Sequence, residues 1–520
     1  MKIERTKNAS RNIATGLALK VYRTVAPFIM RTALIYLLGV QYLGLSSLFT
    51  SILEVLNLAE LGVGSAMVYS MYKPIVDDDS DTICALMNMY KKYYRIIGLV
   101  VLVLGIALYP FVPKLIHGTV PSDINVRYLF LFYLATTVLS YWLFAYKNAL
   151  LQAHQRVDVT NNIGLVFDTV KYILQLLILF LIPNYYWYVV IILVTQIMVN
   201  LYTAYRVDRM YPQYIAKGDL PKQSVKEINQ RVKDLFTSKV GAIIVNSSDT
   251  IVISAFLGLT ALAIYQNYFY ILSSIIAIVL VLFQSSMAGI GNSIIVESSE
   301  KNYSDFRQFT FIIAWVATFA TSCLSVLYQP FMLIWVGEDL MVSMSVVVCL
   351  CVYYFVYEFN QLMNVYKDAA GMWHEDRWRP LVTALTNLGL NLLMVRHFGL
   401  YGIMLSTVIA MVFVGMPWLL HNLFTVIFPH EYLKNYLGLL AKYTVIGLVV
   451  SSVTYVSTTM IRLSPWLDFF VKLAICLVLP NILLFIICFK DKEFIATLRL
   501  ADRMVRGKLP FGKLASKLEK

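Results

Sequence analysis

Long apolar runs recur from one end of the chain to the other, and most are close to the length that crosses a membrane as a helix. Fourteen such runs lie at residues 16–38, 45–70, 96–116, 127–146, 163–182, 185–205, 235–256, 261–287, 308–328, 342–365, 381–395, 401–420, 437–461 and 466–488. They lack the apolar–polar alternation of membrane β-barrel strands. We therefore predict an all-α membrane protein with about fourteen transmembrane helices.

Composition supports a membrane protein and narrows its chemistry. Of the 520 residues, 59% are hydrophobic and 14% are charged, and the mean hydropathy is +0.69, whereas soluble domains carry about 25% charged residues. The net charge of +13 lies mainly in connections and termini, which suits anionic lipid headgroups rather than nucleic acid. The six cysteines show no metal-ligand spacing. We expect buried thiols and no cofactor.

The distribution of Lys and Arg predicts the orientation. Every second connection, counted from the N-terminus and taken with the adjoining ends of the spans, together holds 33 of the 43 basic residues, and the other connections with their adjoining span ends hold four. Because basic residues gather on the cytoplasmic side, we predict a bacterial inner-membrane protein with both termini in the cytoplasm. The largest polar connection, near 206–234, is then cytoplasmic. No outer connection is long enough for a catalytic domain, so we do not expect an enzyme.

The two halves of the chain resemble each other. Residues 42–48 (YLGLSSL) match 256–262 (FLGLTAL), and 61–67 (LGVGSAM) echo 288–294 (AGIGNSI). The nearly constant offset predicts two parallel six-helix repeats around a cleft, as in alternating-access transporters, and the paired glycines indicate close helix packing. The predicted domains are an N-lobe at 1–215, a C-lobe at 216–428, two further helices within 429–489 and a basic cytoplasmic amphipathic tail at 490–520.

The first predicted span carries a basic face. At 100° per residue, Lys20, Arg23, Pro27 and Arg31 fall within about 80°. A charge in hydrocarbon costs at least about 2.5–3.5 kcal/mol. Lys20 and Arg23 are close enough to the cytoplasmic end to extend to the headgroups. Arg31 lies more than two turns deeper, so we expect it to line a cavity.

The second span has a polar face that contains Glu54 and Asn57. Glu54 is placed to pair with Arg31, either as a static buried ion pair or as a pair that opens when an anionic ligand competes for the arginine. In the fifth span, Asp168 and Lys171 are three residues apart and are expected to form a structural pair.

The seventh span places Lys239, Asn246, Asp249 and Thr250 on about 100° of one face. Asp249 is a candidate cation or proton site, because a buried carboxylate exchanges a proton readily. The alternative is structural polar packing, and the sequence leaves both open.

Polar residues also recur in the second half. Glu358, Gln361 and Asn364 follow one another at intervals of three in the tenth span, and Asn387 and Asn391 lie one turn apart in the eleventh. This spacing places each group on one helix face, where it could line the cleft of the second repeat.

Two segments resemble known transporters. Residues 31–48 (RTALIYLLGVQYLGLSSL), followed by 60–66 (ELGVGSA), are similar to the start of Wzx-type polysaccharide flippases, and 248–265 (SDTIVISAFLGLTALAIY) resemble the start of their second repeat. The resemblance implies the multidrug/oligosaccharidyl-lipid/polysaccharide exporter fold. It implies an undecaprenyl-diphosphate-linked oligosaccharide as substrate, for O-antigen, capsule or exopolysaccharide. It implies that Arg31 belongs to a basic cavity lining, with a weaker correspondence for Arg23 and Lys20. It also implies that Asp249 stands at a position where many relatives carry an acidic residue.

Alternatives remain at this point. A drug/cation antiporter of the same superfamily usually has twelve spans and lacks the basic first span. A lipid II flippase has fourteen spans and a cationic cavity, and is harder to distinguish. A membrane polysaccharide polymerase or ligase would need an external catalytic loop. For a flippase, the partners would be the lipid-linked oligosaccharide, the bilayer, H+ or Na+ as coupling ion, and polysaccharide polymerase and chain-length proteins.

Overall fold

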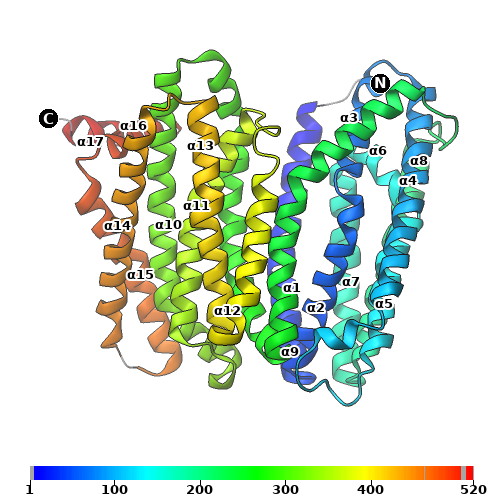
Figure 1. Ribbon diagram of the computed structural model, residues 1–520, viewed down its shortest axis with the longest axis horizontal. Coiled ribbons are helices and arrows are strands. Elements are labelled where there is room, and N and C mark those ends of the chain that lie inside the picture. Colours follow the sequence, from blue (N-terminus) through cyan, green and yellow to red (C-terminus); the bar gives the residue numbers. More distant parts are fainter. Residues whose placement is uncertain (1–4, 462, 505–510, 519–520) are drawn as a thin grey trace. The chain divides into compact units, whose positions relative to one another are not determined.

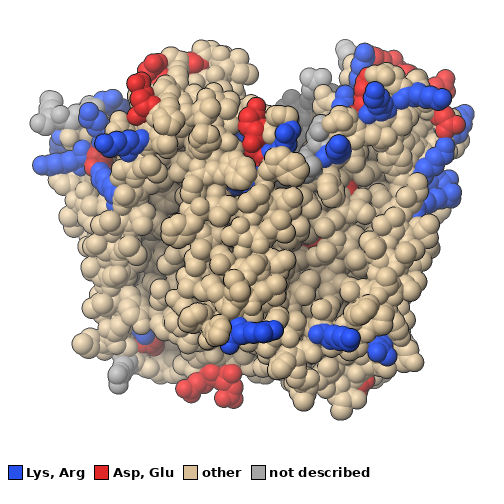
Figure 2. All heavy atoms as spheres, in the orientation of Figure 1, with Lys and Arg blue, Asp and Glu red and all other residues tan. Residues whose placement is uncertain are grey.

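The computed structural model describes residues 5–461, 463–504 and 511–518, and these residues form helices and connections without a β-strand. Contacts divide the chain into unit 1, Met1–Gln266, and unit 2, Asn267–Lys520. Within each unit, Figure 2 shows a broad band almost free of charged side chains between two charged ends, as expected for a protein that crosses a bilayer.

Unit 1 is a bundle of long helices (Figure 1). Its elements are α1 (Arg5–Leu37), α2 (Val40–Leu56), the 3-10 turn η1 (Asn57–Glu60), α3 (Val63–Val76), α4 (Ser80–Leu108), η2 (Val112–Leu115), α5 (Val126–Trp142), η3 (Ala145–Lys147), α6 (Asn148–Ala153), α7 (Val157–Leu181), α8 (Tyr185–Met210) and the first part of α9 (Lys222–Val296).

Unit 2 contains the rest of α9 and a second bundle. Its elements are α10 (Ser299–Val336), η4 (Glu338–Leu340), α11 (Met344–Ala369), α12 (Arg379–Ala410), the π-helical turn η5 (Met411–Gly415), α13 (Met416–Val426), α14 (Tyr432–Thr459), α15 (Pro465–Cys488), α16 (Lys492–Met504) and α17 (Phe511–Leu518). The contact boundary at 266/267 separates compact units. The repeat boundary at 215/216 is a statement about sequence similarity and stays a prediction.

Each of the fourteen predicted spans is mostly helical, which confirms the predicted all-α membrane fold. Within the described residues, nine helical stretches are long and apolar enough to cross a membrane, or ten if one bent pair is a single span. Two of the nine, Ile243–Val281 and Arg379–Val426, each hold two predicted spans. Two stretches are not counted. The apolar part of α1 is interrupted by Lys20, Arg23 and Arg31, and that of α4 is short because Lys91, Lys92 and Arg95 precede it.

Glycines mark where the helices break. Gly258 has φ 88° inside α9, and Gly62 has φ 85° between η1 and α3, a region that side chains with a Cβ rarely enter. A Cβ on Gly62 would also lie 2.7 Å from the Cβ of Leu235. The predicted close packing is therefore present at Gly62. At Gly289 nothing lies within 4 Å of an added Cβ, so packing does not explain that glycine.

The largest polar connection is shorter than the predicted 206–234. The structure continues α8 to Met210 and begins α9 at Lys222, so only residues 211–221 are non-helical there. Polar residues at helical spacing support the start of α9, where the Gln223 amide donates to Glu227 four residues later.

The C-terminal tail begins with an amphipathic helix, as its pattern predicts. Glu493 of α16 forms an ion pair with Arg307 of α10, and the ring of Phe494 stacks on Trp315 at 5.8 Å between centroids. These contacts attach α16 to the bundle of unit 2. The membrane-surface role of the tail stays a prediction.

A histidine is buried at the connection between α6 and α7. The Nδ1 atom of His154 lies 2.9 Å from the Leu150 carbonyl oxygen, and the ring lies 4.4 Å from that of Tyr211. The Nε2 atom is buried, with no hydrogen-bond partner in the described part of the chain. Burial lowers the pKa of His154, because the charged form loses hydration.

Acidification is therefore expected to destabilise the protein through His154. As pH falls below the ordinary histidine pKa of about 6.5, the unfolded chain takes up a proton before the folded chain does, so the free energy of unfolding decreases. The melting temperature in detergent should fall by a few degrees more for wild type than for His154→Gln between about pH 7.5 and about pH 5.5. Equal falls for both proteins would contradict this role.

Candidate functional site

The basic face of α1 meets acidic and basic residues of α7. The Arg23 guanidinium contacts one oxygen of Asp168 at 2.9 Å, and the Lys171 ammonium contacts the other at 2.7 Å. The predicted Asp168–Lys171 pair therefore forms, and Arg23 joins it from 145 positions earlier. The Arg23 side chain is 55% exposed. Two cations share one carboxylate, so the group keeps a net positive charge that an anion can reach.

Arg31 lies deeper along α1, about 12 Å from Arg23 at 1.5 Å per residue. It is half-buried, and one of its guanidinium nitrogens lies 3.5 Å from the Gln266 carbonyl oxygen. The Gln266 amide in turn donates to Thr250 of α9 at 3.0 Å. Gln266 therefore links Arg31 to the segment of α9 that carries Asp249. Lys20 is also half-buried on α1.

Glu54 of α2 also faces α9. The hydroxyl of Ser247 donates to a Glu54 oxygen at 3.2 Å, and the Glu54 side chain is exposed. Asn57 opens η1, and its Oδ1 atom is buried with no hydrogen-bond partner among the described residues. A direct Arg31–Glu54 pair stays a prediction.

Asp249 is buried on α9 beside buried Ser248 and Thr250. A buried carboxylate among small polar side chains suits either cation binding or structural packing, so this candidate stays open. The side chains of Lys239 and Asn246 lie outside the described residues.

Unit 2 buries a carboxylate in the middle of α11. The Glu358 side chain is only 1% exposed, and it lies more than two turns from either end of the helix. One of its oxygens has no hydrogen-bond partner in the part of the chain that the structure describes. Gln361, one turn on, is half-buried. An ionised group is costly here.

Asn387 lies in a different environment, a saturated polar network. Its amide nitrogen donates to Thr407 at 2.9 Å, and its oxygen accepts from Asn391 at 3.3 Å. All three side chains are buried. The network joins the two halves of α12 across its break at Gly399.

Sequence reasoning missed a buried ion pair at the start of α12. Arg379 makes two hydrogen bonds to Asp376, at 2.6 and 2.7 Å, and the Asp376 side chain is 3% exposed. Asn422 of α13 donates to the same carboxylate at 3.1 Å, and Arg379 also donates to Asn364 of α11 at 2.8 Å. The spacing of three between opposite charges was the available signal. The cluster fixes three helices of unit 2 together.

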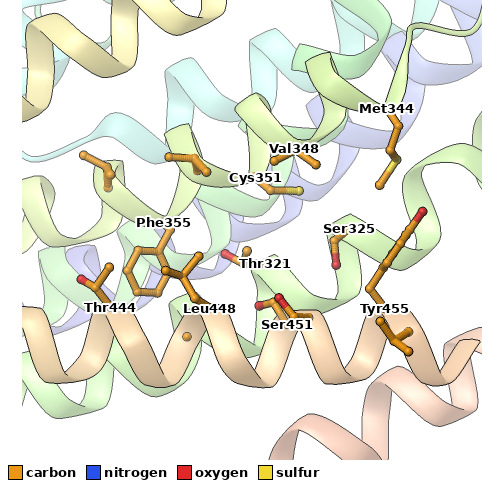
Figure 3. Close-up of a pocket in the computed structure, with 15 residues that line it drawn as sticks. Thr321, Ser325, Met344, Val348, Cys351, Phe355, Thr444, Leu448, Ser451 and Tyr455 are labelled. Atoms are coloured by element: carbon orange, nitrogen blue, oxygen red, sulfur yellow. The ribbon is translucent and has the colours of Figure 1, made fainter.

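Sequence reasoning also missed an apolar pocket in unit 2, because its lining comes from three separate helices. It has a volume of about 370 Å³. Figure 3 shows Val348 and Cys351 of α11 facing Ser451 and Tyr455 of α14, with Thr321 and Ser325 of α10 behind them. Gly447 keeps α14 close to α11, since a Cβ there would lie 2.8 Å from the Phe355 ring.

The comparisons with known proteins identify the fold. No family model and no curated protein matches the chain. Among solved structures, the inward closed conformation of the lipid II flippase MurJ is similar with a TM-score of 0.62 and 15% identity, covering 92% of this chain and 99% of that one. An inward-facing multidrug resistance MATE family transporter of the MOP superfamily is similar at 0.60 and 15%, covering 81% and 99%.

An outward-facing MATE family transporter is similar at a TM-score of 0.55 and 14% identity, covering 82% of this chain and 97% of that one. The chain therefore has the fold of MOP superfamily transporters and is a multi-pass membrane protein. The neighbours are transporters and not enzymes.

Proposed function

We propose that this protein is a flippase that moves undecaprenyl-diphosphate-linked oligosaccharide repeat units from the cytoplasmic to the outer leaflet of a bacterial inner membrane. The observation that carries the proposal is the basic group on α1, where Arg23 and Lys171 share Asp168 and Arg23 stays exposed. A diphosphate is the anion such a group is suited to bind.

Anion exchange gives this site a way to bind and release its ligand. In the absence of ligand, Asp168 neutralises part of the charge on Arg23 and Lys171. A diphosphate oxygen can replace the carboxylate on Arg23, since a guanidinium forms paired hydrogen bonds with either group. Lys171 then keeps Asp168 in place. Binding and release need no covalent step, which agrees with a transporter that works by alternating access.

The apolar pocket of unit 2 supports a lipid-linked substrate. Its walls are aliphatic and aromatic apart from a few hydroxyl groups that largely bond within the helices, such as Ser325 with the Ser322 carbonyl. A prenyl chain gains free energy from contact with such walls without needing a polar partner. We propose that part of the prenyl tail occupies this pocket during transport.

Filling the pocket is expected to slow transport of long-chain substrates. Val348→Trp would place an indole in the space that the tail needs, and a loss of roughly tenfold corresponds to about two methylene groups left unburied at ~0.8 kcal/mol each. Val449→Trp, at a similarly exposed valine of α14 outside the pocket lining, is the matched control. Initial rates would be compared for long-chain and short-chain prenyl-diphosphate oligosaccharides. Equal losses for both chain lengths would argue against tail binding here.

Coupling to an ion would make the cycle directional. Among the candidates Glu54, Asp249 and Glu358, we favour Glu358 as a proton carrier, because its carboxyl group is the most deeply buried of the three.

In the cell, the expected partners are the polysaccharide polymerase and chain-length proteins that use the exported repeat unit. Both termini would lie in the cytoplasm.

Reconstitution tests the proposal directly. Purified protein in liposomes should speed the movement of a fluorescent prenyl-diphosphate oligosaccharide between leaflets, compared with protein-free liposomes. Transport of small organic cations with no movement of any prenyl-diphosphate sugar would instead indicate a drug antiporter.

Lipid II transport is the second candidate. One of the similar structures is the lipid II flippase MurJ, whose match covers 92% of this chain, and this supports lipid II as an alternative substrate. Lipid II offered beside an oligosaccharide repeat unit in the same liposomes distinguishes the two flippase functions.

A further inference from the structure

Unit 1 contains a polar pocket of about 200 Å³ that the diphosphate site does not use. Its walls come from η1, α3, α4, η3 and α6, and α3 packs against both α4 and α6 (Figure 1). The pocket exists because of two interruptions in the predicted spans, at Gly62 and at Phe144, both with positive φ. Its polar lining residues are Glu60, Ser65, Tyr90, Tyr94, Asn148 and Gln152.

Hydrogen bonds hold one wall of the pocket in place. Tyr94 donates to the Glu60 carboxylate at 3.2 Å, and Tyr90 donates to the Tyr94 hydroxyl. Gly64 faces this group, and a Cβ there would lie 3.0 Å from the Tyr90 hydroxyl and 3.3 Å from the Glu60 oxygen. Glycine at this position therefore preserves space beside an oriented carboxylate.

The opposite wall presents groups that both donate and accept. The Asn148 oxygen accepts from Thr160 at 3.0 Å, so its NH2 group is the part of this amide that can donate to a ligand. In the part of the chain that the structure describes, the side chains of Ser65 and Gln152 are exposed and form no hydrogen bond. A ligand entering the pocket can thus bond with an amide, a hydroxyl and the Asn148 NH2 group.

This mixture selects a class of ligand. A phosphate would be repelled by the Glu60 carboxylate. An inorganic cation would leave the amide NH2 groups without an acceptor. A sugar ring carries hydroxyl groups that donate and accept at once, and it matches both walls. The volume is below the roughly 300–1,000 Å³ of pockets for drug-sized ligands, so it suits one ring rather than a whole oligosaccharide.

We propose that the pocket binds one sugar ring of the transported oligosaccharide and so contributes to substrate selection. This inference rests on the proposed flippase function. The diphosphate would bind at the basic group on α1, which does not recognise sugars, and the pocket would add the recognition that the basic group lacks.

The test compares two probes in the same liposomes: a fluorescent prenyl diphosphate carrying a trisaccharide, and the same lipid without sugar. The double variant Ser65→Ala/Gln152→Met removes the unused polar groups without adding bulk to the pocket, and we expect it to lose about tenfold in trisaccharide–lipid movement, the effect of one or two lost hydrogen bonds. Movement of the sugar-free lipid should stay within about twofold of wild type. Gln213→Met, at an exposed glutamine outside the pocket, is the matched control.

Labelling gives a second measurement that does not depend on transport. The six native cysteines are buried or partly buried, so a Ser65→Cys protein should react with a maleimide mainly at the new thiol. The trisaccharide lipid should protect this thiol, and the sugar-free lipid should not.

The outcomes separate the two proposals. Selective loss in the double variant with selective protection of the thiol supports the sugar site. Unchanged movement of both probes, equal loss of both, or a loss that follows Na+ concentration rather than sugar overturns it while wild-type transport still stands. If wild type moves neither probe, the flippase function itself fails.

Discussion

Replacing Arg31 with alanine is expected to lower translocation of a prenyl-diphosphate oligosaccharide by roughly ten- to a hundredfold, because a hydrogen bond to a charged group contributes about 1.5–3 kcal/mol. Arg31 is half-buried, so its charge acts where water screens it weakly. The readout is the initial rate of leaflet exchange in liposomes, with the thermal melting temperature of each variant measured beside it.

Two further variants distinguish the contributions of the charge, the guanidinium geometry and the neighbouring arginine. Arg31→Lys keeps the charge but loses the planar fork that matches a phosphate, so its rate should lie between those of wild type and Arg31→Ala. Arg23→Ala should also lower the rate, because the diphosphate is proposed to replace Asp168 on this guanidinium. A normally folded Arg31→Ala protein that transports at the wild-type rate would remove Arg31 from the site and leave the basic group around Arg23 as the candidate.

The helices could be predicted from the sequence because each span carries its own apolar signal. The breaks could not, since they depend on neighbours that are distant along the chain. Gly62 ends a turn where a Cβ would collide with Leu235, and Phe144 adopts φ 59° where α5 ends and η3 begins. Both lie inside predicted continuous spans, and both are needed to form the polar pocket. Hydropathy averages over such positions and does not detect them.

For the candidate site too, the sequence predicts local groupings of residues but not contacts between distant helices. Helical periodicity placed Arg23 and Arg31 on one face of the first span, which stays a prediction, and it correctly paired Asp168 with Lys171. It did not join Arg23 to Asp168, nor Glu54 to Ser247, because these contacts span 145 and 193 positions. Arg379 was counted among the charges of a cytoplasmic connection, although it is buried against Asp376. A short segment shows which residues share a face but not which helix that face meets.

Glu358→Gln is expected to abolish the response of transport to a pH gradient. An ionised carboxylate in the membrane interior costs at least about 2.5–3.5 kcal/mol, and Glu358 is buried with one oxygen that lacks a hydrogen-bond partner among the described residues. The neutral acid is therefore compatible with this conformation, while the ionised form needs water or a cation. Proton loss would favour a conformation that opens the interior of unit 2, and a permanently neutral glutamine would not supply that driving force.

The measurement compares leaflet exchange with and without an imposed pH gradient. Wild type should accelerate under the gradient, and Glu358→Gln should show the same basal rate without acceleration. Glu338→Gln, at an exposed acid in the connection between α10 and α11, controls for a general effect of removing a carboxylate. A full gradient response in Glu358→Gln would exclude it as the proton carrier. If wild type responds to a Na+ gradient and not to pH, the cycle is coupled to a metal cation, and the buried Asp249 becomes the residue to test next.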